Sequence, residues 1–139
     1  MEYSIVYLSS SRILSDEAAL NKIIAESRAN NASSNITGAL LYCNGSIIQV
    51  LEGEKEVVDS LFNKIKRDHR HSQVIPLFQD FVQNRSFEKW AMGYSTPTSR
   101  NMQELRDQLA FIDNPYLPAS SNNRILSLLQ TFFKNNYRN

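Results

Sequence analysis

The sequence has little of the glycine that nucleotide-binding loops need. Four glycines occur among 139 residues, at positions 38, 45, 53 and 93, and none belongs to a G-x-G-x-x-G or G-K-[ST] motif. Such glycines let a backbone approach phosphate groups closely. A dinucleotide-binding or P-loop site is therefore not expected.

Cysteine, long apolar runs and net charge are scarce as well. Cys43 is alone, which excludes a disulfide framework within the chain. No run reaches the roughly 18 apolar residues of a membrane span, and the start MEYSIVYLSS lacks the basic region of a signal peptide. A net charge of +1 gives no reason to expect nucleic acid or membrane as a partner. We expect a soluble, cytoplasmic protein.

The residues that are present suit one folded domain, with 42% hydrophobic and 21% charged residues. Asn-Gly at 44–45, between two apolar runs, is a strong hairpin signal, and Pro76 predicts an edge or bulged strand. Hydrophobic periodicity predicts helices over 16–29 and 54–70 and strands over 3–9, 36–43, 46–52, 73–83 and 90–95.

This order, β-α-β-β-α-β with a fifth strand added, predicts a ferredoxin-like α+β sandwich with both helices on one face of the sheet. The character of the sequence changes after residue 96, so we expect a domain over 1–96 and a helical extension over 97–139. We expect the extension to cover the bare face of the sheet or a neighbouring subunit. Its two apolar stripes are Met102, Leu105, Leu109 and Ile112, then Ile125, Leu128, Leu129 and Phe132.

Catalytic and metal-binding patterns are weak. His69 and His71 form an H-x-H pair without the further ligands of a metal site, and solvated histidines at a helix end are the simpler interpretation. Ser9 begins a run of three serines that lacks the surroundings of a nucleophile. We expect neither a metal nor a catalytic residue.

Gln49 is unusual because it interrupts the apolar run IIQVL. In a ferredoxin-like sheet the first and third strands are neighbours, so Tyr7 and Gln49 can meet if both face the helices. A buried hydrogen bond that satisfies both groups is the simplest interpretation. Ser27, Asn31 and Asp68 end the helix stripes above the same sheet face. This convergence favours a pocket for a planar polar ligand.

These residues lie in motifs that resemble the BLUF family, sensors of blue light using FAD. Together the motifs cover residues 3 to about 95, and their order and spacing carry the resemblance. They are IVYLS with Tyr7, SRANN with Asn31, ITGALLY, IIQVLEG with Gln49, RDHRH with Asp68 and His71, and FEKWAMGY with Trp90 and Met92.

The resemblance implies FAD, or FMN or riboflavin in its place, between the two helices. Tyr7 would be the photochemical donor of an electron and a proton, Gln49 would bridge Tyr7 and the flavin, and Asn31 would bind the edge of the ring. Trp90 and Met92 would pass the signal into the fifth strand. The other implied cofactor-binding residues are Ser27, Asn30, Lys64, Asp68, Arg70 and His71.

The side-chain chemistry of Lys64 and of Gln49 bears on this expectation. Many family members carry Arg where Lys64 stands, and Lys keeps the charge but loses the bidentate geometry of a guanidinium. The amide of Gln49 has both a donor and an acceptor end, so it can be satisfied between a tyrosine hydroxyl and a flavin carbonyl in two arrangements. A light-driven change between them would shift the absorption to the red.

We therefore expect a photoreceptor that turns over no substrate and signals to an unidentified partner protein. The short chain resembles stand-alone members whose C-terminal helices assist assembly, which favours a homo-oligomer. A light-independent flavoenzyme is one alternative, although no additional acid-base set is evident. A ferredoxin-like regulator that binds a ligand other than flavin is the second alternative.

Overall fold

The protein is described by a computed structural model over residues 2–10, 17–43, 45–68, 72–87, 93–95 and 124–137. A five-stranded sheet forms its centre, in the order β4-β1-β3-β2-β5. The strands β1 to β4 pair antiparallel, and β5 pairs parallel to β2. Their bounds are β1 (Glu2–Ser10), β2 (Thr37–Cys43), β3 (Ser46–Gly53), β4 (Ser72–Val82) and β5 (Gly93–Ser95).

The predicted order of elements is confirmed, and so is the ferredoxin-like α+β class with an added fifth strand. The predicted hairpin is also confirmed, because β2 and β3 pair up to Cys43 and Ser46, with two residues between them. Gly45 takes a φ of 82° there, a conformation that favours glycine. Gly38 is required for another reason, since a Cβ at this position would lie 1.9 Å from the carbonyl oxygen of Val50.

The strand β4 shows both features that Pro76 predicts. It lies at the edge of the sheet, and its register against β1 shifts so that Val6 faces Phe78 while Tyr7 faces Pro76. Leu77 is the extra residue of this irregularity. A bulge disrupts the ladder locally, so a proline, which has no backbone N–H to donate, is tolerated there.

The helix α1 (Glu17–Ser33) continues past the predicted end at residue 29. It stops where Asn35 takes a left-handed φ of 55°. The amide of Ile36 then donates to the carbonyl of Asn31 at 2.9 Å, and the amide of Asn35 to that of Ala32 at 3.5 Å. This is a Schellman arrangement with asparagine in place of the usual glycine, which is why the end was harder to predict.

The helix α2 (Lys55–Arg67) is shorter than the predicted 54–70. Asp68 leaves the helix with an extended backbone, while its amide still donates to the carbonyl of Ile65 at 3.1 Å. Asp68 therefore lies at the end of the side of α2 on which Ile65 packs against the core, as predicted. The apolar side of α2 buries Val58 and Phe62 against the sheet.

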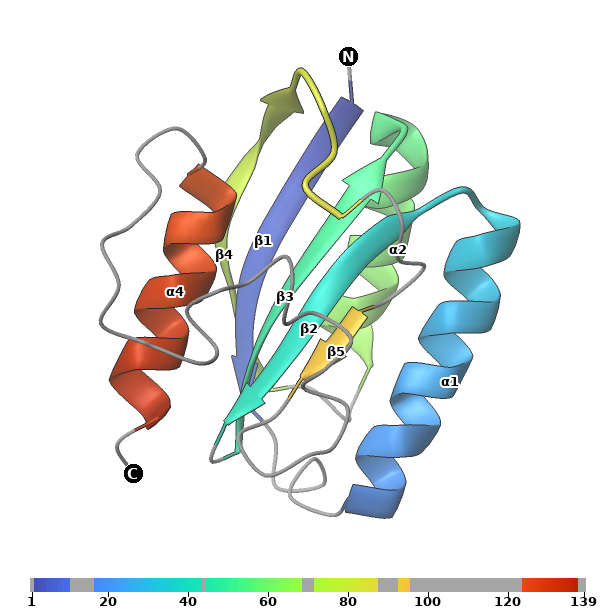
Figure 1. The fold of residues 1–139 in the computed structure, drawn as a ribbon. Coiled ribbons are helices and arrows are strands. Elements are labelled where there is room, and N and C mark those ends of the chain that lie inside the picture. Colours follow the sequence, from blue (N-terminus) through green and yellow to red (C-terminus); the bar gives the residue numbers. More distant parts are fainter. Residues whose placement is uncertain are drawn as a thin grey trace.

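Alternate side chains of the strands point to opposite faces of the sheet. We call the face under α1 and α2 the α1/α2 face and the other one the α4 face, after the helix α4 (Arg124–Tyr137) that covers it. Figure 1 shows α4 on the opposite side of the sheet from α2. The buried core of the α1/α2 face consists of Tyr3, Ile5, Tyr7, Ile23, Ile24, Ile36, Leu40, Ile47, Leu51, Val58 and Phe62.

The α4 face has its own apolar core. It consists of Val6, Ala39, Leu41, Ile48, Val50, Phe87, Ile125, Leu129, Phe132 and Phe133. The last helix of the extension therefore covers the bare face of the sheet, which is the first of the two predicted positions. The stripe predicted around Met102 to Ile112 lies outside the described residues.

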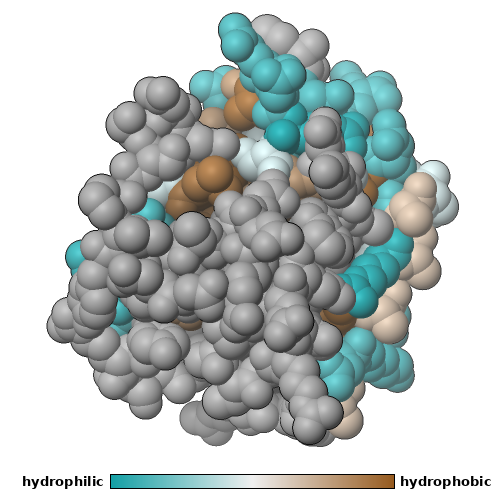
Figure 2. Space-filling view, in the orientation of Figure 1, coloured by the Kyte–Doolittle hydropathy of each residue, from teal (hydrophilic) through white to brown (hydrophobic). Residues whose placement is uncertain are grey.

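The surface agrees with this layering. Along the right edge of Figure 2, where α1 lies in Figure 1, hydrophilic residues alternate with weakly hydrophobic ones. Ile23 and Ile24 of the same helix are buried in the core of the α1/α2 face. Within the described ranges, no helix has the length and apolar character needed to cross a membrane.

Candidate functional site

The centre of the α1/α2 face holds a buried tyrosine–glutamine pair. Tyr7 on β1 lies directly opposite Gln49 on β3, and the Tyr7 hydroxyl donates a hydrogen bond to Oε1 of Gln49. Tyr7 is fully buried and Gln49 is 4% exposed. The predicted meeting of the two side chains across the ladder is confirmed.

The surroundings of Tyr7 keep its hydroxyl protonated. Burial raises the pKa of Tyr7 far above its ordinary value, and the nearby charge of Asp68 raises it further. The Tyr7 ring also packs on Phe62 of α2, with centroids 5.3 Å apart. Tyr7 is therefore a fixed, neutral hydrogen-bond donor throughout the physiological range of pH.

A cavity opens beside Gln49, between the two helices. Its volume is about 170 Å³. Apolar side chains such as Ile23, Leu61 and Ile65 mix here with amide, hydroxyl and charged groups. The polar groups that line it are Glu26, Ser27, Asn30, Asn31, Gln49, Lys64 and Asp68.

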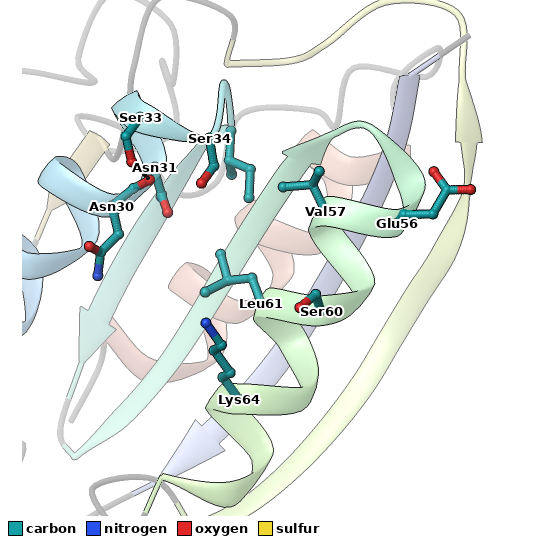
Figure 3. Close-up of a pocket in the computed structure, with 10 residues that line it drawn as sticks. Asn30, Asn31, Ser33, Ser34, Glu56, Val57, Ser60, Leu61 and Lys64 are labelled. Atoms are coloured by element: carbon teal, nitrogen blue, oxygen red, sulfur yellow. Dashed lines mark hydrogen bonds between the residues drawn. The ribbon is translucent and has the colours of Figure 1, made fainter.

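A larger cavity of about 450 Å³ adjoins the first one, since Asn30, Asn31, Leu61 and Lys64 line both. It runs between the end of α1 and the middle of α2. In the close-up of Figure 3, Leu61 and Lys64 point from α2 toward the end of α1, whereas Glu56 points away. Together the two cavities form a slot between α1 and α2, and Gln49 lies at the bottom of this slot.

The end of α1 fixes one wall of this slot. Asn31 is 1% exposed although its side chain is polar. Its carbonyl receives amides from Ser34 and Ile36 in the turn that ends the helix, so its backbone is held in place. A buried carboxamide in this position can offer both a donor and an acceptor to a ligand in the slot.

The mixed lining of the slot suits a molecule that combines apolar surface with polar groups. Such ligands are held by apolar walls and a few well-placed polar groups, here the amides of Asn31 and Gln49. A flavin ring has this chemistry, because its pyrimidine edge carries carbonyl acceptors and an N–H donor. Lys64 is exposed at the side of the slot, where a cation could attract a phosphate-bearing chain. The donor set therefore fits a flavin.

The structure brings together most of the predicted site residues. Tyr7, Gln49 and Asn31 are buried at the slot, while the half-buried Ser27 and Asp68 line its inner part. The exposed residues Asn30 and Lys64 line both cavities. The remaining predictions concern Arg70, His71, Trp90 and Met92, which lie outside the described residues.

Several lining residues were not predicted as site residues. Leu61 and Ile65 belong to the apolar stripe of α2, and this pattern predicts packing against the sheet rather than contact with a ligand. Ser60 and Glu26 line the cavities, and nothing in their sequence surroundings marks them. These residues can be assigned to the slot only from the folded structure, in which α1 and α2 together form its walls.

Comparison with known proteins supports the same interpretation. The chain is 31% identical to the photoactivated adenylate cyclase subunit beta of Euglena longa over 112 residues, which are 77% of this chain and 13% of that protein. It thus spans a small part of the curated relatives that it matches.

Two solved structures resemble the fold closely. One is BlrB, a BLUF protein in its dark state, with a TM-score of 0.69 and 30% identity over 94% of each chain. The other is BlrP1 of Klebsiella pneumoniae with FMN and cyclic diGMP, with a TM-score of 0.77 and 28% identity, covering 95% of this chain and 34% of that one.

The family model described as sensors of blue-light using FAD matches residues 3–93. That range holds Tyr7, Gln49 and every described residue that lines the slot. The chain therefore belongs to the BLUF family of blue-light sensors that use FAD.

Proposed function

We propose that FAD binds in the slot between α1 and α2 and that Tyr7 and Gln49 form the photoactive pair. The observation that carries this proposal is the buried hydrogen bond from the Tyr7 hydroxyl to Oε1 of Gln49, beside a cavity that apolar side chains and the amides of Asn31 and Gln49 line. An isolated structural hydrogen bond would satisfy both groups without needing a cavity beside it.

The hydrogen bond gives the pair its proposed chemistry. When bound, the flavin supplies the absorption of blue light and, once excited, an oxidising centre. Tyr7 acts as the donor of one electron and of its hydroxyl proton, and both return to it at the end of the cycle. Oε1 of Gln49 accepts the hydrogen bond from the Tyr7 hydroxyl, so the amide nitrogen of Gln49 points away from Tyr7. Rotation or tautomerisation of the carboxamide changes the group that Gln49 presents to the slot.

The cofactor would be held by residues from both helices. Asn31 binds the polar edge of the ring, Ser27 and Asn30 line the slot, and Asp68 closes its inner end. Lys64 attracts the phosphates, together with Arg70 and His71. FMN could stand in place of FAD, and the similar Klebsiella protein was solved with FMN.

We propose that the chain reports light to a separate protein and turns over no substrate itself. Its photoactive pair regains its starting composition after each cycle, as a sensor requires. Several relatives are photoactivated adenylate cyclases by name, which supports an output through effector proteins. We place the flavin-binding domain at 1–96 and the extension at 97–139, with Trp90 and Met92 as the signal relay between them. We further propose a homo-oligomer in the cytoplasm.

The test is the absorption spectrum of the purified protein. We expect a yellow protein whose flavin bands shift to the red under blue light and return in the dark. Chromatography of the flavin released by denaturation will identify it as FAD or FMN. A colourless protein, or flavin bands that do not change reversibly with light, would contradict the proposal. Reduction of substrates in the dark would favour a flavoenzyme instead.

A further inference from the structure

The segment 85–87, which follows β4, is attached to three strands on the α4 face. The Arg85 guanidinium lies 3.1 Å from a carboxylate oxygen of Glu2 on β1. It also donates to the Thr37 hydroxyl on β2 at 3.3 Å. The amide of Phe87 donates to Oε1 of Glu52 on β3 at 2.9 Å. Arg85 thus bridges the two strands that flank β3, and Phe87 is bound to β3 itself.

Glu52 is an unusual residue at the centre of this arrangement. It is fully buried, and burial raises its pKa, which the amides of Ser86 and Phe87 and the charge of Arg85 lower only in part. Among the described residues, its second oxygen, Oε2, has no hydrogen-bond partner. A buried carboxylate with an unsatisfied oxygen costs stability, and the hydroxyl of Ser4, the facing residue on β1, also lowers the pKa of Glu52.

Glu52 and Gln49 belong to the same strand but point to opposite faces of the sheet. Gln49 pairs with Tyr7 on the α1/α2 face, whereas Glu52 pairs with Ser4 and Thr37 toward the α4 face. The two residues are three positions apart, or roughly 10 Å along a strand. A displacement of β3 at Gln49 would therefore have to pass through only two intervening residues to reach Glu52.

Phe87 connects Glu52 to the helix α4. Its side chain is fully buried in the core of the α4 face, together with Ile125, Leu129 and Phe133 of α4. The hydrogen bond from its amide to Glu52 is charge-assisted when the carboxylate is ionised. It links β3 directly to a residue of the core that packs on α4.

We propose that Glu52 is a positioning residue that transmits the change at Gln49 through the sheet to Phe87 and the helix α4. This rests on the function proposed above, because it requires a light-driven change at Gln49. It adds a route through β3 to the opposite face of the sheet, separate from Trp90 and Met92. A contiguous route alone does not demonstrate coupling, so the test must measure the response of Phe87 to light.

The test uses amide hydrogen exchange of the full chain with flavin bound, in the dark and under continuous blue light, alongside the visible spectrum. Glu52→Leu removes the acceptor for Phe87 while keeping a similar volume, and Glu52→Gln keeps an acceptor without the charge. Asp80→Asn is the matched control. Asp80 also accepts a backbone amide, that of Phe81 at 2.7 Å, but it is exposed on the edge strand.

In the wild type and in Asp80→Asn, we expect light to change the exchange rate of the Phe87 amide by about fivefold or more, as a coupling of ordinary size would. In Glu52→Leu, we expect the dark rate to rise about tenfold or more through loss of the hydrogen bond. The light-dependent change should disappear there while the red shift remains. Glu52→Gln should keep a reduced response, and it serves alone if the Leu variant does not fold.

Two results would overturn the proposal and identify the step that fails. A normal red shift in the wild type, without any change at Phe87, would refute the route through Glu52 and leave the photoreceptor function intact. An undiminished light response of Phe87 in both Glu52 variants would do the same. Absence of a red shift in the wild type would refute the proposed function, and the route would fall with it.

Discussion

The two faces of the sheet are built from the same strands but serve different purposes. On the α1/α2 face, buried polar side chains such as Tyr7, Asn31 and Gln49 converge beside a cavity. On the α4 face, apolar side chains of the strands and of α4 form a closely packed core, and Glu52 is buried at its end. Buried polar groups cost stability unless they are satisfied. Ser4, Glu52 and Gln130 are buried on the α4 side as well, but Asn31 and Gln49 line a cavity, which supports the ligand site proposed between α1 and α2.

The largest effect expected on the α1/α2 face follows from Tyr7→Phe. Phe keeps the packing of the ring but lacks the hydroxyl that donates to Gln49. We expect this variant to bind flavin and to lose the reversible red shift completely, as measured by absorption before and after blue light. Tyr42→Phe is the control, since Tyr42 packs half-buried against the same core. A normal photocycle in Tyr7→Phe would exclude Tyr7 as the required donor.

The α4 face should respond with a change in stability. Leu129 is fully buried against the sheet, so Leu129→Ala should lower the free energy of unfolding by about 2–5 kcal/mol. Urea denaturation will measure this change. Leu128→Ala, at a half-buried position of the same helix, should cost clearly less. Both variants should keep the red shift where they remain folded, because neither residue contacts the slot. Equal losses in the two variants would contradict the packing described for α4.

A smaller effect should appear in the dependence of stability on pH. Burial raises the pKa of Glu52 in the folded protein, so the folded state holds this proton more tightly than the unfolded state. The free energy of unfolding should therefore fall as pH rises from the ordinary pKa of glutamate to the raised one. The slope from one such group is at most about 1.4 kcal/mol per pH unit.

Denaturation of the wild type and of Glu52→Gln between pH 4 and pH 8 will isolate this component, which the Gln variant should lack. Asp80→Asn, at an exposed position, should retain it. The same pH dependence in Glu52→Gln and in the wild type would show that Glu52 does not ionise in this range.

The sequence predicts the order of the strands and the meeting of Tyr7 and Gln49, because both depend on local patterns and on a known arrangement of strands. The end of α1 was harder to predict, because Asn35 adopts a left-handed conformation that glycine usually takes. The burial of Glu52 could not be read from the sequence, where a glutamate near a strand end suggests solvent. Its amide partner Phe87 lies 35 positions further along the chain.

The most direct test of the central claim is the light-minus-dark absorption spectrum of Gln49→Leu beside the wild type. Gln79→Leu, at an exposed position of β4, controls for replacing a strand glutamine by leucine. We predict that all three proteins bind flavin, that the wild type and Gln79→Leu show the red shift, and that Gln49→Leu shows none. A red shift of normal size and position in Gln49→Leu would contradict the account, because the switch would then lie elsewhere.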